Sequence, residues 1–152
     1  MEYNSNNIEE TKLVAKDLVG IISKKNTENN AVVVLLYGDL GTGKTTLTKE
    51  FAKIIGITDI IISPTFVLEK VYNIQKNGIF GTRFNKLVHI DAYRISKKTD
   101  LDIIGWSDIK DDVKNIVFVE WPELVDGVAM KDAIKIKFEH KGESSRKITI
   151  QT

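Results

Sequence analysis

A phosphate-binding loop is the stretch of this sequence with the clearest chemistry. Residues 38–45 read GDLGTGKT and fit the pattern G-x-x-x-x-G-K-[ST] without a mismatch. In such a loop the glycines let the backbone curl so that several N–H groups point inward, and the following helix adds its positive end. Lys44 would reach the β- and γ-phosphates of a nucleotide, and Thr45 would give its hydroxyl to Mg²⁺. The loop therefore predicts a site for a nucleotide with its metal ion.

The rest of the sequence helps to decide whether the base of that nucleotide is adenine or guanine. A GTPase needs an Asn-Lys-x-Asp motif to read guanine, but the pair Asn85-Lys86 is followed by Leu87 and Val88. Residues 102–105, DIIG, imitate the Asp-x-x-Gly switch of GTPases, but no strand is predicted before them. We interpret them as the end of a short helix, and we expect ATP rather than GTP.

Two acidic residues each end an apolar segment. Asp91 closes KLVHID and Glu120 closes NIVFVE, and both segments have the composition of buried strands. In an open α/β sheet these strand ends fall at the edge that also carries the phosphate loop. Mg²⁺ bound to phosphates needs a carboxylate there, so one acid could hold the metal, directly or through water, and the other could orient an attacking water. The residues alone leave open which acid has which role.

Three further features, the SPTF motif, Trp121 and His89, can each be explained either by a function or by a purely structural role. SPTF, residues 63–66, offers two hydroxyl groups that could sense a γ-phosphate, although a turn before a strand is the simpler interpretation. Trp121 could belong to an interface, but a lone tryptophan more often belongs to the core. We favour His89 as a core residue or as a hydrogen-bond partner that orients another group, rather than as a catalytic base.

Hydrophobic periodicity and turn residues predict the elements that must position these side chains. Asn7, with Glu10 three residues later, suits the start of a helix. Asn77-Gly78 is a hairpin signal between two strands. The predicted elements are a helix over 8–24, a buried strand over 31–37, a helix over 44–55, a short and a longer strand on either side of the SPTF loop, strands ending at Asp91 and Glu120, one short helix ended by Gly105, and an antiparallel C-terminal hairpin over 132–152.

Length and composition limit the class of protein. The 152 residues are enough for a single domain, 1–152, with its own hydrophobic core. The absence of cysteine excludes disulfides and thiolate metal sites. The net charge of +1 gives no overall drive toward nucleic acid. No apolar run approaches the roughly 20 residues of a membrane helix and the N-terminus is unlike a signal peptide, so we expect a cytoplasmic protein with no membrane partner.

Four motifs, taken in order, resemble those of one family. They are LYGDLGTGKTTL at 36–47, SPTF at 63–66, HIDAYR at 89–94 and VEWPE at 119–123. In this order they resemble the TsaE (YjeE-like) ATPases of bacterial tRNA threonylcarbamoyladenosine biosynthesis. The resemblance runs from about Ile8 to the C-terminus. It departs from the family at NIQKNGIFGTRF, residues 73–84, which is longer than the usual hairpin there and receives no family role.

The resemblance implies a fold and a set of site residues. The fold would be α/β, a P-loop NTPase-like three-layer sandwich in which a mixed β-sheet is flanked by helices and carries the C-terminal antiparallel hairpin. Lys44, Asp91 and Glu120 would form the catalytic set. The other implied roles are the phosphate cradle (Gly41, Thr42, Gly43, Lys44, Thr45, Thr46), the Mg²⁺ ligands (Thr45 and Glu120, with Asp91 near the metal or its waters), a nucleotide-sensing loop (Thr65), an adenine-side contact (Thr11) and a function beyond packing (Trp121).

The implied activity is hydrolysis of ATP to ADP with Mg²⁺ as cofactor. The hydrolysis would drive or reset a TsaD–TsaB complex that attaches threonylcarbamoyl to adenosine 37 of tRNA. The expected partners are therefore TsaD-like and TsaB-like subunits, with tRNA reached indirectly through them. The chain would be a weak ATPase alone and would not perform the transfer itself.

Two other functions fit the phosphate loop. The first is a small-molecule P-loop kinase, a class that usually brings several arginines and a lid to exclude water. The chain has only Arg83, Arg94 and Arg146, of which we expect Arg94 alone near the site, so the sequence disfavours a kinase. The second is a nucleotide-dependent binding module that never hydrolyses its ligand.

Overall fold

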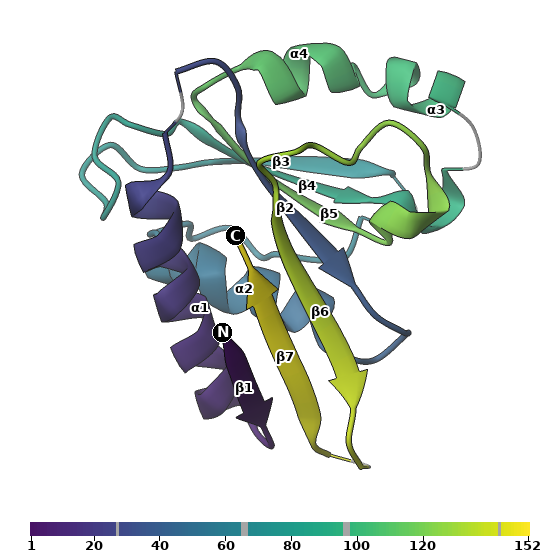
Figure 1. The fold of residues 1–152 in the computed structure, drawn as a ribbon. Helices are drawn as coiled ribbons and strands as arrows, with labels where there is room; N and C mark the ends of the chain where they lie inside the picture. Colours follow the sequence, from purple (N-terminus) through teal and green to yellow (C-terminus); the bar gives the residue numbers. More distant parts are fainter. Residues whose placement is uncertain (27, 65–66, 96–97, 143) are drawn as a thin grey trace.

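The computed structural model describes residues 1–26, 28–64, 67–95, 98–142 and 144–152. In this described part, seven strands form one mixed sheet with helices on both faces, as Figure 1 shows. The strand order is β1-β7-β6-β2-β5-β4-β3. The bounds are β1 Glu2–Ser5, β2 Val32–Tyr37, β3 Glu69–Asn73, β4 Lys86–Asp91, β5 Asn115–Glu120, β6 Ile134–His140 and β7 Arg146–Gln151. The predicted α/β class, the mixed flanked sheet and the C-terminal antiparallel hairpin β6–β7 are confirmed.

The centre of the sheet is parallel. Strand β2 pairs in parallel with β5 on one side and with β6 on the other, and β4 is parallel to β5. Alternate residues of β2 face two separate core clusters: Val34 lies in one, and Val33 and Leu35 lie in the other. Burial on both faces explains why this strand has an uninterrupted apolar sequence.

Two helices cover one face of the sheet. They are α1, Ile8–Lys24, and α2, Lys44–Ile54, and their apolar residues share a core cluster with β2, β5 and β6. The predicted start of α1 is confirmed, because Asn7 is the N-cap and its side chain accepts a hydrogen bond from the backbone N–H of Glu10. The Glu10 carboxylate in turn accepts from the backbone N–H of Asn6. Helix α2 begins at the last residues of the phosphate loop.

The opposite face carries two short helices where one was predicted. They are α3, Lys98–Ile103, and α4, Trp106–Asp111. Gly105 does interrupt the helix, with φ at +69°, but the chain resumes a helix immediately afterwards. Trp106 provides the reason: its side chain is buried and its indole N–H donates to the carbonyl of Gly127 at 3.1 Å. Short 3-10 turns, η1 Ala92–Arg94 and η2 Pro122–Leu124, follow β4 and β5.

The region around the SPTF motif differs from its prediction. Strand β3 and its antiparallel partner β4 are confirmed, but the short strand expected before the motif is irregular chain. Ile61 is buried there while Ile60 and Ile62 are exposed, so one core contact produced the alternating pattern without a strand partner. Pro64 is buried, and Thr65 with Phe66 lies outside the described residues.

The long connection between β3 and β4 is part of the core. The rings of Phe80 and Phe84 meet edge to face, with centroids 5.1 Å apart, and Phe80 also lies 6.5 Å from Phe51 of α2. Arg83 donates hydrogen bonds to the carbonyls of Ser23 and Lys25 at the end of α1. The two strands are therefore joined not by a tight turn but by a segment that closes one end of the helical layer.

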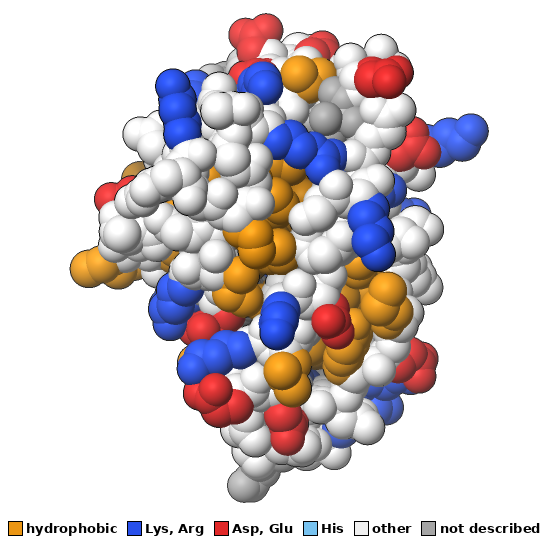
Figure 2. Space-filling model, turned by 90° about the vertical axis from the view of Figure 1, so that its left-hand side faces the viewer, with side chains coloured by type: hydrophobic (Ala, Val, Ile, Leu, Met, Phe, Trp, Pro, Cys, Tyr) orange, Lys and Arg blue, Asp and Glu red, His pale blue; other side chains and the backbone are white. Residues whose placement is uncertain are grey.

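The N-terminal strand β1 was not predicted from the sequence. Its four residues are largely polar and pair antiparallel with β7, in the register Glu2↔Thr149 to Ser5↔Arg146. It completes an edge of the sheet. Among the described residues, no helix has the length and apolar character needed to cross a membrane. On the face seen in Figure 2, apolar side chains gather in patches near the middle, and both basic and acidic side chains lie around them.

Candidate functional site

A cavity of about 440 Å³ lies at the carboxyl ends of β2, β4 and β5. Its location agrees with the rule that ligands of open α/β sheets bind beyond the carboxyl ends of the parallel strands. The lining residues are Leu40, Gly41, Gly43, Lys44, Thr45 and Thr46 from the loop and α2, together with Ser63, Asp91, Tyr93, Glu120, Trp121 and Arg146. The predicted phosphate loop and both predicted acids are thus brought to one site.

The phosphate loop owes its curl to glycine. Gly38, Gly41 and Gly43 have φ values of +137°, +77° and +105°, which other residues rarely adopt. At Gly38 an added Cβ would also lie 2.6 Å from the backbone oxygen of Phe138, so no side chain fits. Gly43 is the N-cap of α2 and has no side chain to accept hydrogen bonds from the first turn. The backbone N–H groups of the first turn of α2 are therefore available to bind an anion.

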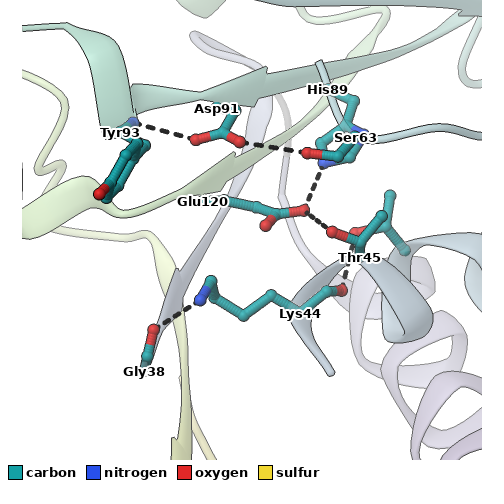
Figure 3. Close-up of polar contacts among 9 residues, drawn as sticks. Gly38, Lys44, Thr45, Ser63, His89, Asp91, Tyr93 and Glu120 are labelled. Carbon is teal, nitrogen blue, oxygen red and sulfur yellow. Dashed lines mark hydrogen bonds and ion pairs between the residues drawn. The ribbon is translucent and has the colours of Figure 1, made fainter. Parts of the chain in front are cut away.

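Lys44 is a buried cation held by backbone oxygens. It is 4 % exposed, and its Nζ donates to the carbonyl of Gly38 at 2.5 Å (Figure 3) and to that of Asp39 at 3.0 Å. The ammonium also lies 3.9 Å from the centroid of the Trp121 ring. Burial lowers the pKa of Lys44, while the negative charge of Glu120 opposes that shift. No described carboxylate lies within ion-pair distance of Nζ, so a phosphate would supply the missing counter-charge.

Glu120 connects the phosphate loop to β4. Its Oε1 accepts a hydrogen bond from the Thr45 hydroxyl at 2.7 Å and lies 2.8 Å from Nε2 of His89 (Figure 3). All three side chains are on the α2 side of the sheet, and His89 is fully buried. The interpretation of His89 as a hydrogen-bonded residue is confirmed.

Asp91 lies beside Glu120 but has different partners. The two acids are directly opposite each other in the parallel β4–β5 register. Asp91 Oδ1 accepts from the backbone N–H of Tyr93 at 3.0 Å, which caps η1, and Oδ2 accepts from the Ser63 hydroxyl at 3.2 Å. Asp91 therefore ties the segment that contains Ser63 to the end of β4, next to the cavity.

Trp121 lies between the core and the cavity. Its backbone has φ at +58°, a conformation that is unusual for a bulky residue, and its N–H donates to the carbonyl of Leu36 at 3.2 Å. The half-buried ring packs on the second core cluster and contacts Tyr93, with centroids 5.3 Å apart. Because the Lys44 ammonium also lies over this ring, the tryptophan lies at the candidate site as well as in the packing.

Arg146 is a site residue that the sequence analysis missed. It starts β7, lines the cavity, and its Nη1 lies 3.5 Å from the position that a Cβ on Gly43 would occupy. Its Nε is buried and has no hydrogen-bond partner within the described chain. The expectation that Arg94 alone would lie near the site is wrong, because Arg94 is not among the lining residues. The hairpin pattern of the tail carried the signal, since it returns the start of β7 to the carboxyl end of β6.

All the implied site roles stay predictions, and three of the implied residues are not among the described residues that line the cavity. Thr65 lies outside the described residues. Thr11 is buried, with its hydroxyl 2.9 Å from that of Ser5, and is not among the residues that line the cavity. Thr42 is also buried, and both its hydroxyl and its N–H donate to the carbonyl of Asp39. Thr42 thereby stabilises the curled loop from inside.

The oxygen donors at this site fit Mg²⁺. No three His, Cys, Asp or Glu side chains of the described chain cluster as a complete metal site. Mg²⁺ does not need such a cage, because it is usually held by one or two carboxylates together with phosphates and water. Thr45 Oγ1 and Glu120 lie together at the loop, and the second oxygen of Glu120 receives no hydrogen bond from the described residues.

Comparisons with known proteins give a consistent result. A family model described as threonylcarbamoyl adenosine biosynthesis protein TsaE matches residues 5–148. The chain is similar to the tRNA threonylcarbamoyladenosine biosynthesis protein TsaE of Bacillus subtilis, with 35 % identity over 150 residues that cover 98 % of this chain and 84 % of the relative. The protein of the same name from Haemophilus influenzae is 33 % identical over 125 residues, which cover 82 % of this chain and 73 % of the relative.

The fold has a solved counterpart. The crystal structure of Bacillus subtilis YdiB superposes with a TM-score of 0.66 at 31 % identity, covering 99 % of this chain and 83 % of that one. The family match includes the phosphate loop, both strand-end acids and Trp121. This chain therefore belongs to the TsaE family.

Proposed function

We propose that this chain, a TsaE family member that takes part in threonylcarbamoyladenosine biosynthesis on tRNA, is a Mg²⁺-dependent ATP hydrolase. The hydrolysis drives or resets a complex of TsaD-like and TsaB-like subunits. The single observation that supports the proposal most is the 2.7 Å hydrogen bond from Thr45 to Glu120, at the mouth of a curled phosphate loop. It joins the two oxygen donors that a nucleotide-bound Mg²⁺ requires.

The charges around the cavity favour a polyphosphate. Two cations line the cavity, Lys44 from the loop itself and Arg146 from the start of β7, and the first turn of α2 adds its N–H groups. The base would be adenine, because the sequence lacks the Asn-Lys-x-Asp motif that reads guanine. ATP therefore fits the site better than GTP or a single phosphate.

The hydrogen bonds suggest how the two acids divide their roles. Both oxygens of Asp91 accept hydrogen bonds, from Tyr93 and Ser63, whereas Glu120 uses only Oε1 within the described chain. Glu120 is therefore the proposed metal-side acid, and Asp91 is proposed to position the Ser63 segment and the attacking water. When bound, Mg²⁺ would neutralise charge on the β- and γ-phosphates. Attack by water on the γ-phosphorus would break its bond to the bridging oxygen and release ADP and phosphate.

The open mouth of the cavity favours weak turnover by the isolated chain. Leu40, in the loop itself, is 84 % exposed, and Tyr93, which also lines the cavity, is 57 % exposed. Exposed apolar groups next to a charged site are suited to contact with another protein, which would exclude water and complete the site. We propose that the TsaD-like and TsaB-like subunits provide that cover.

A phosphate-release assay tests the proposal. The chain should release phosphate from ATP slowly when alone and faster with the TsaD-like and TsaB-like subunits, and Lys44→Ala or Glu120→Ala should abolish the release. Loss of activity in both folded variants supports hydrolysis at this site. Near-normal release by Glu120→Ala in the complex would contradict the role of Glu120, and no release by the wild type would favour a binding module.

The alternative function is a small-molecule kinase. One observation favours it: Arg146 lines the cavity, and kinases of this class usually have arginines at the site. Incubating the protein with labelled ATP and a panel of small hydroxyl and carboxyl acceptors separates the two functions. Transfer of label to an acceptor would support the kinase. Release of label only as inorganic phosphate, together with co-purification of the two subunits, would support the ATPase.

A further inference from the structure

His89 is a buried polar residue that does not reach the cavity. It is fully buried on β4, and its neighbours Val88 and Ile90 face the other side of the sheet. Its Nε2 lies 2.8 Å from Oε1 of Glu120. Since the imidazole contacts no open space, any effect it has on the reaction must pass through Glu120.

The hydrogen in this contact can be assigned. An ionised carboxylate only accepts hydrogen bonds, so Nε2 of His89 must be the donor. Its Nδ1 is buried and has no partner among the described residues. The geometry thus makes Nε2 of His89 the donor and Oε1 of Glu120 the acceptor.

From this geometry we infer that His89 is a positioning residue for Glu120, and this inference rests on the proposed function. Two donors, Thr45 and His89, converge on Oε1 from α2 and β4. Together they hold the carboxylate so that Oε2 is the oxygen left for the metal or its waters. Thr45 alone would leave the carboxylate free to rotate about its own contact, and Thr45 is itself a metal ligand in the proposed site.

The expected size of the effect of losing His89 follows from how hydrogen-bond partners of metal-binding residues behave in general. Residues that hydrogen-bond a metal-binding group orient it, and their loss lowers metal affinity or activity about 10–100-fold. Loss of the His89 donor should therefore change the response to Mg²⁺. It should leave the metal-independent contacts between loop and phosphate unchanged, because His89 does not line the cavity.

The experiment compares two substitutions with opposite hydrogen-bonding properties. His89→Leu removes the donor and keeps an apolar side chain of similar size, whereas His89→Gln retains an N–H near the position of Nε2. ADP binding is measured by calorimetry with EDTA and across a Mg²⁺ titration, and phosphate release is measured over the same titration. For His89→Leu we expect the Mg²⁺ midpoint to rise about 10–100-fold, with ADP affinity in EDTA within twofold of wild type. His89→Gln should recover most of the response.

Three results would overturn the inference. The first is a Mg²⁺ midpoint of folded His89→Leu that equals that of the wild type. The second is an impairment of His89→Gln as large as that of His89→Leu. The third is a loss of ADP affinity by His89→Leu that is as large in EDTA as in Mg²⁺. Circular dichroism checks folding, and His89→Met replaces His89→Leu if the latter does not fold, because its flexible side chain fills the space without a donor. If wild type binds Mg²⁺–ADP but never releases phosphate, hydrolysis is refuted while the binding titration still decides the role of His89.

Discussion

At Thr45 a single hydroxyl joins the phosphate loop to the strand that carries Glu120. The residues around it form the proposed polyphosphate site from side chains that are individually ordinary. Lys44 is held by carbonyls of its own loop, and Glu120 is held by Thr45 and His89. Lys44 and Glu120 both have hydrogen-bond partners but no Lys, Arg, Asp or Glu ion-pair partner among the described residues, so a metal–nucleotide complex would complete the electrostatics.

Thr45→Ala tests the proposed role of Thr45 as a Mg²⁺ ligand. The substitution removes one oxygen donor and one hydrogen bond to Glu120, so Mg²⁺–ADP affinity should fall about 10–100-fold while ADP affinity in EDTA changes little. Calorimetry with and without Mg²⁺ measures both quantities. Thr48→Ala is the matched control, since that hydroxyl donates only to the carbonyl of Lys44 one turn earlier. Unchanged Mg²⁺–ADP affinity in Thr45→Ala would refute the assignment.

Trp121→Ala tests whether this residue belongs to the site or to the core. The ring is half-buried and contacts Lys44, so ATP turnover should fall at least about tenfold, equivalent to about 1.4 kcal/mol. Its effect on stability should stay below the ~3–5 kcal/mol of a core tryptophan. Trp106→Ala is the control, because Trp106 is a core residue that should lower Tm strongly and leave turnover per folded molecule unchanged. A large loss of stability in Trp121→Ala with normal turnover per folded molecule would show that Trp121 is a core residue without a role in the site.

Among the helices and strands, the predicted bounds agree best with the structure where the capping residue and the apolar periodicity indicate the same start. Helix α1 was predicted over 8–24 and is observed as Ile8–Lys24, because the Asn7 cap and the apolar spacing point to the same start. Helix α4 was missed because Gly105 ends one helix and a buried tryptophan immediately anchors another. The predicted short strand around Ile61 lacks a partner strand, and alternation alone cannot supply one.

Arg83 shows how an irregular segment can stabilise a helix. Its guanidinium donates to the carbonyls of Ser23 and Lys25 at the end of α1, and it packs over the ring of Phe84 at 4.9 Å. Arg83→Ala should lower stability by about 1 kcal/mol, or Tm by about 2–4 °C, because helix-end carbonyls lose donors. Thermal melting measures the change, and Arg83→Lys should show a smaller loss because it keeps a cationic donor. Turnover per folded molecule should not change, and an unaltered Tm would contradict this capping role.

At the scale of the whole molecule, the site depends on contacts between distant segments. The register places Leu36, Glu120 and Asp91 in one row across three neighbouring strands, so the loop after β2 meets both acids. On the other side, the C-terminal hairpin brings Arg146 to Gly43. Strand β1 supports that hairpin, with Ser5 opposite Arg146. The cavity is therefore formed by residues from both halves of the sequence.

Arg146→Ala tests this long-range contact. If Arg146 contributes to binding phosphate, its loss should weaken ADP binding about tenfold with or without Mg²⁺, as a charge-assisted hydrogen bond of ~1.5–3 kcal/mol predicts. Calorimetry at two salt concentrations measures the effect. Arg146→Lys should recover it only in part, because lysine lacks the bidentate fork. Lys147→Ala is the control, as Lys147 pairs with Glu2 on the surface, and equal affinity of Arg146→Ala and wild type would remove Arg146 from the site.

The phosphate loop, the helix after it and the two acids at strand ends could be predicted from the residues alone. These features depend on the conformational freedom of glycine and on short-range periodicity, which act between neighbouring residues. Three relations became visible with the three-dimensional fold: Glu120 rather than Asp91 bonds Thr45, His89 also contacts Glu120, and Arg146 lines the cavity. Those relations depend on strand register and on burial among segments far apart in the chain. The hairpin pattern of the tail indicated where β7 begins, but the approach of Arg146 to the phosphate loop also depends on the pairing of β6 with β2.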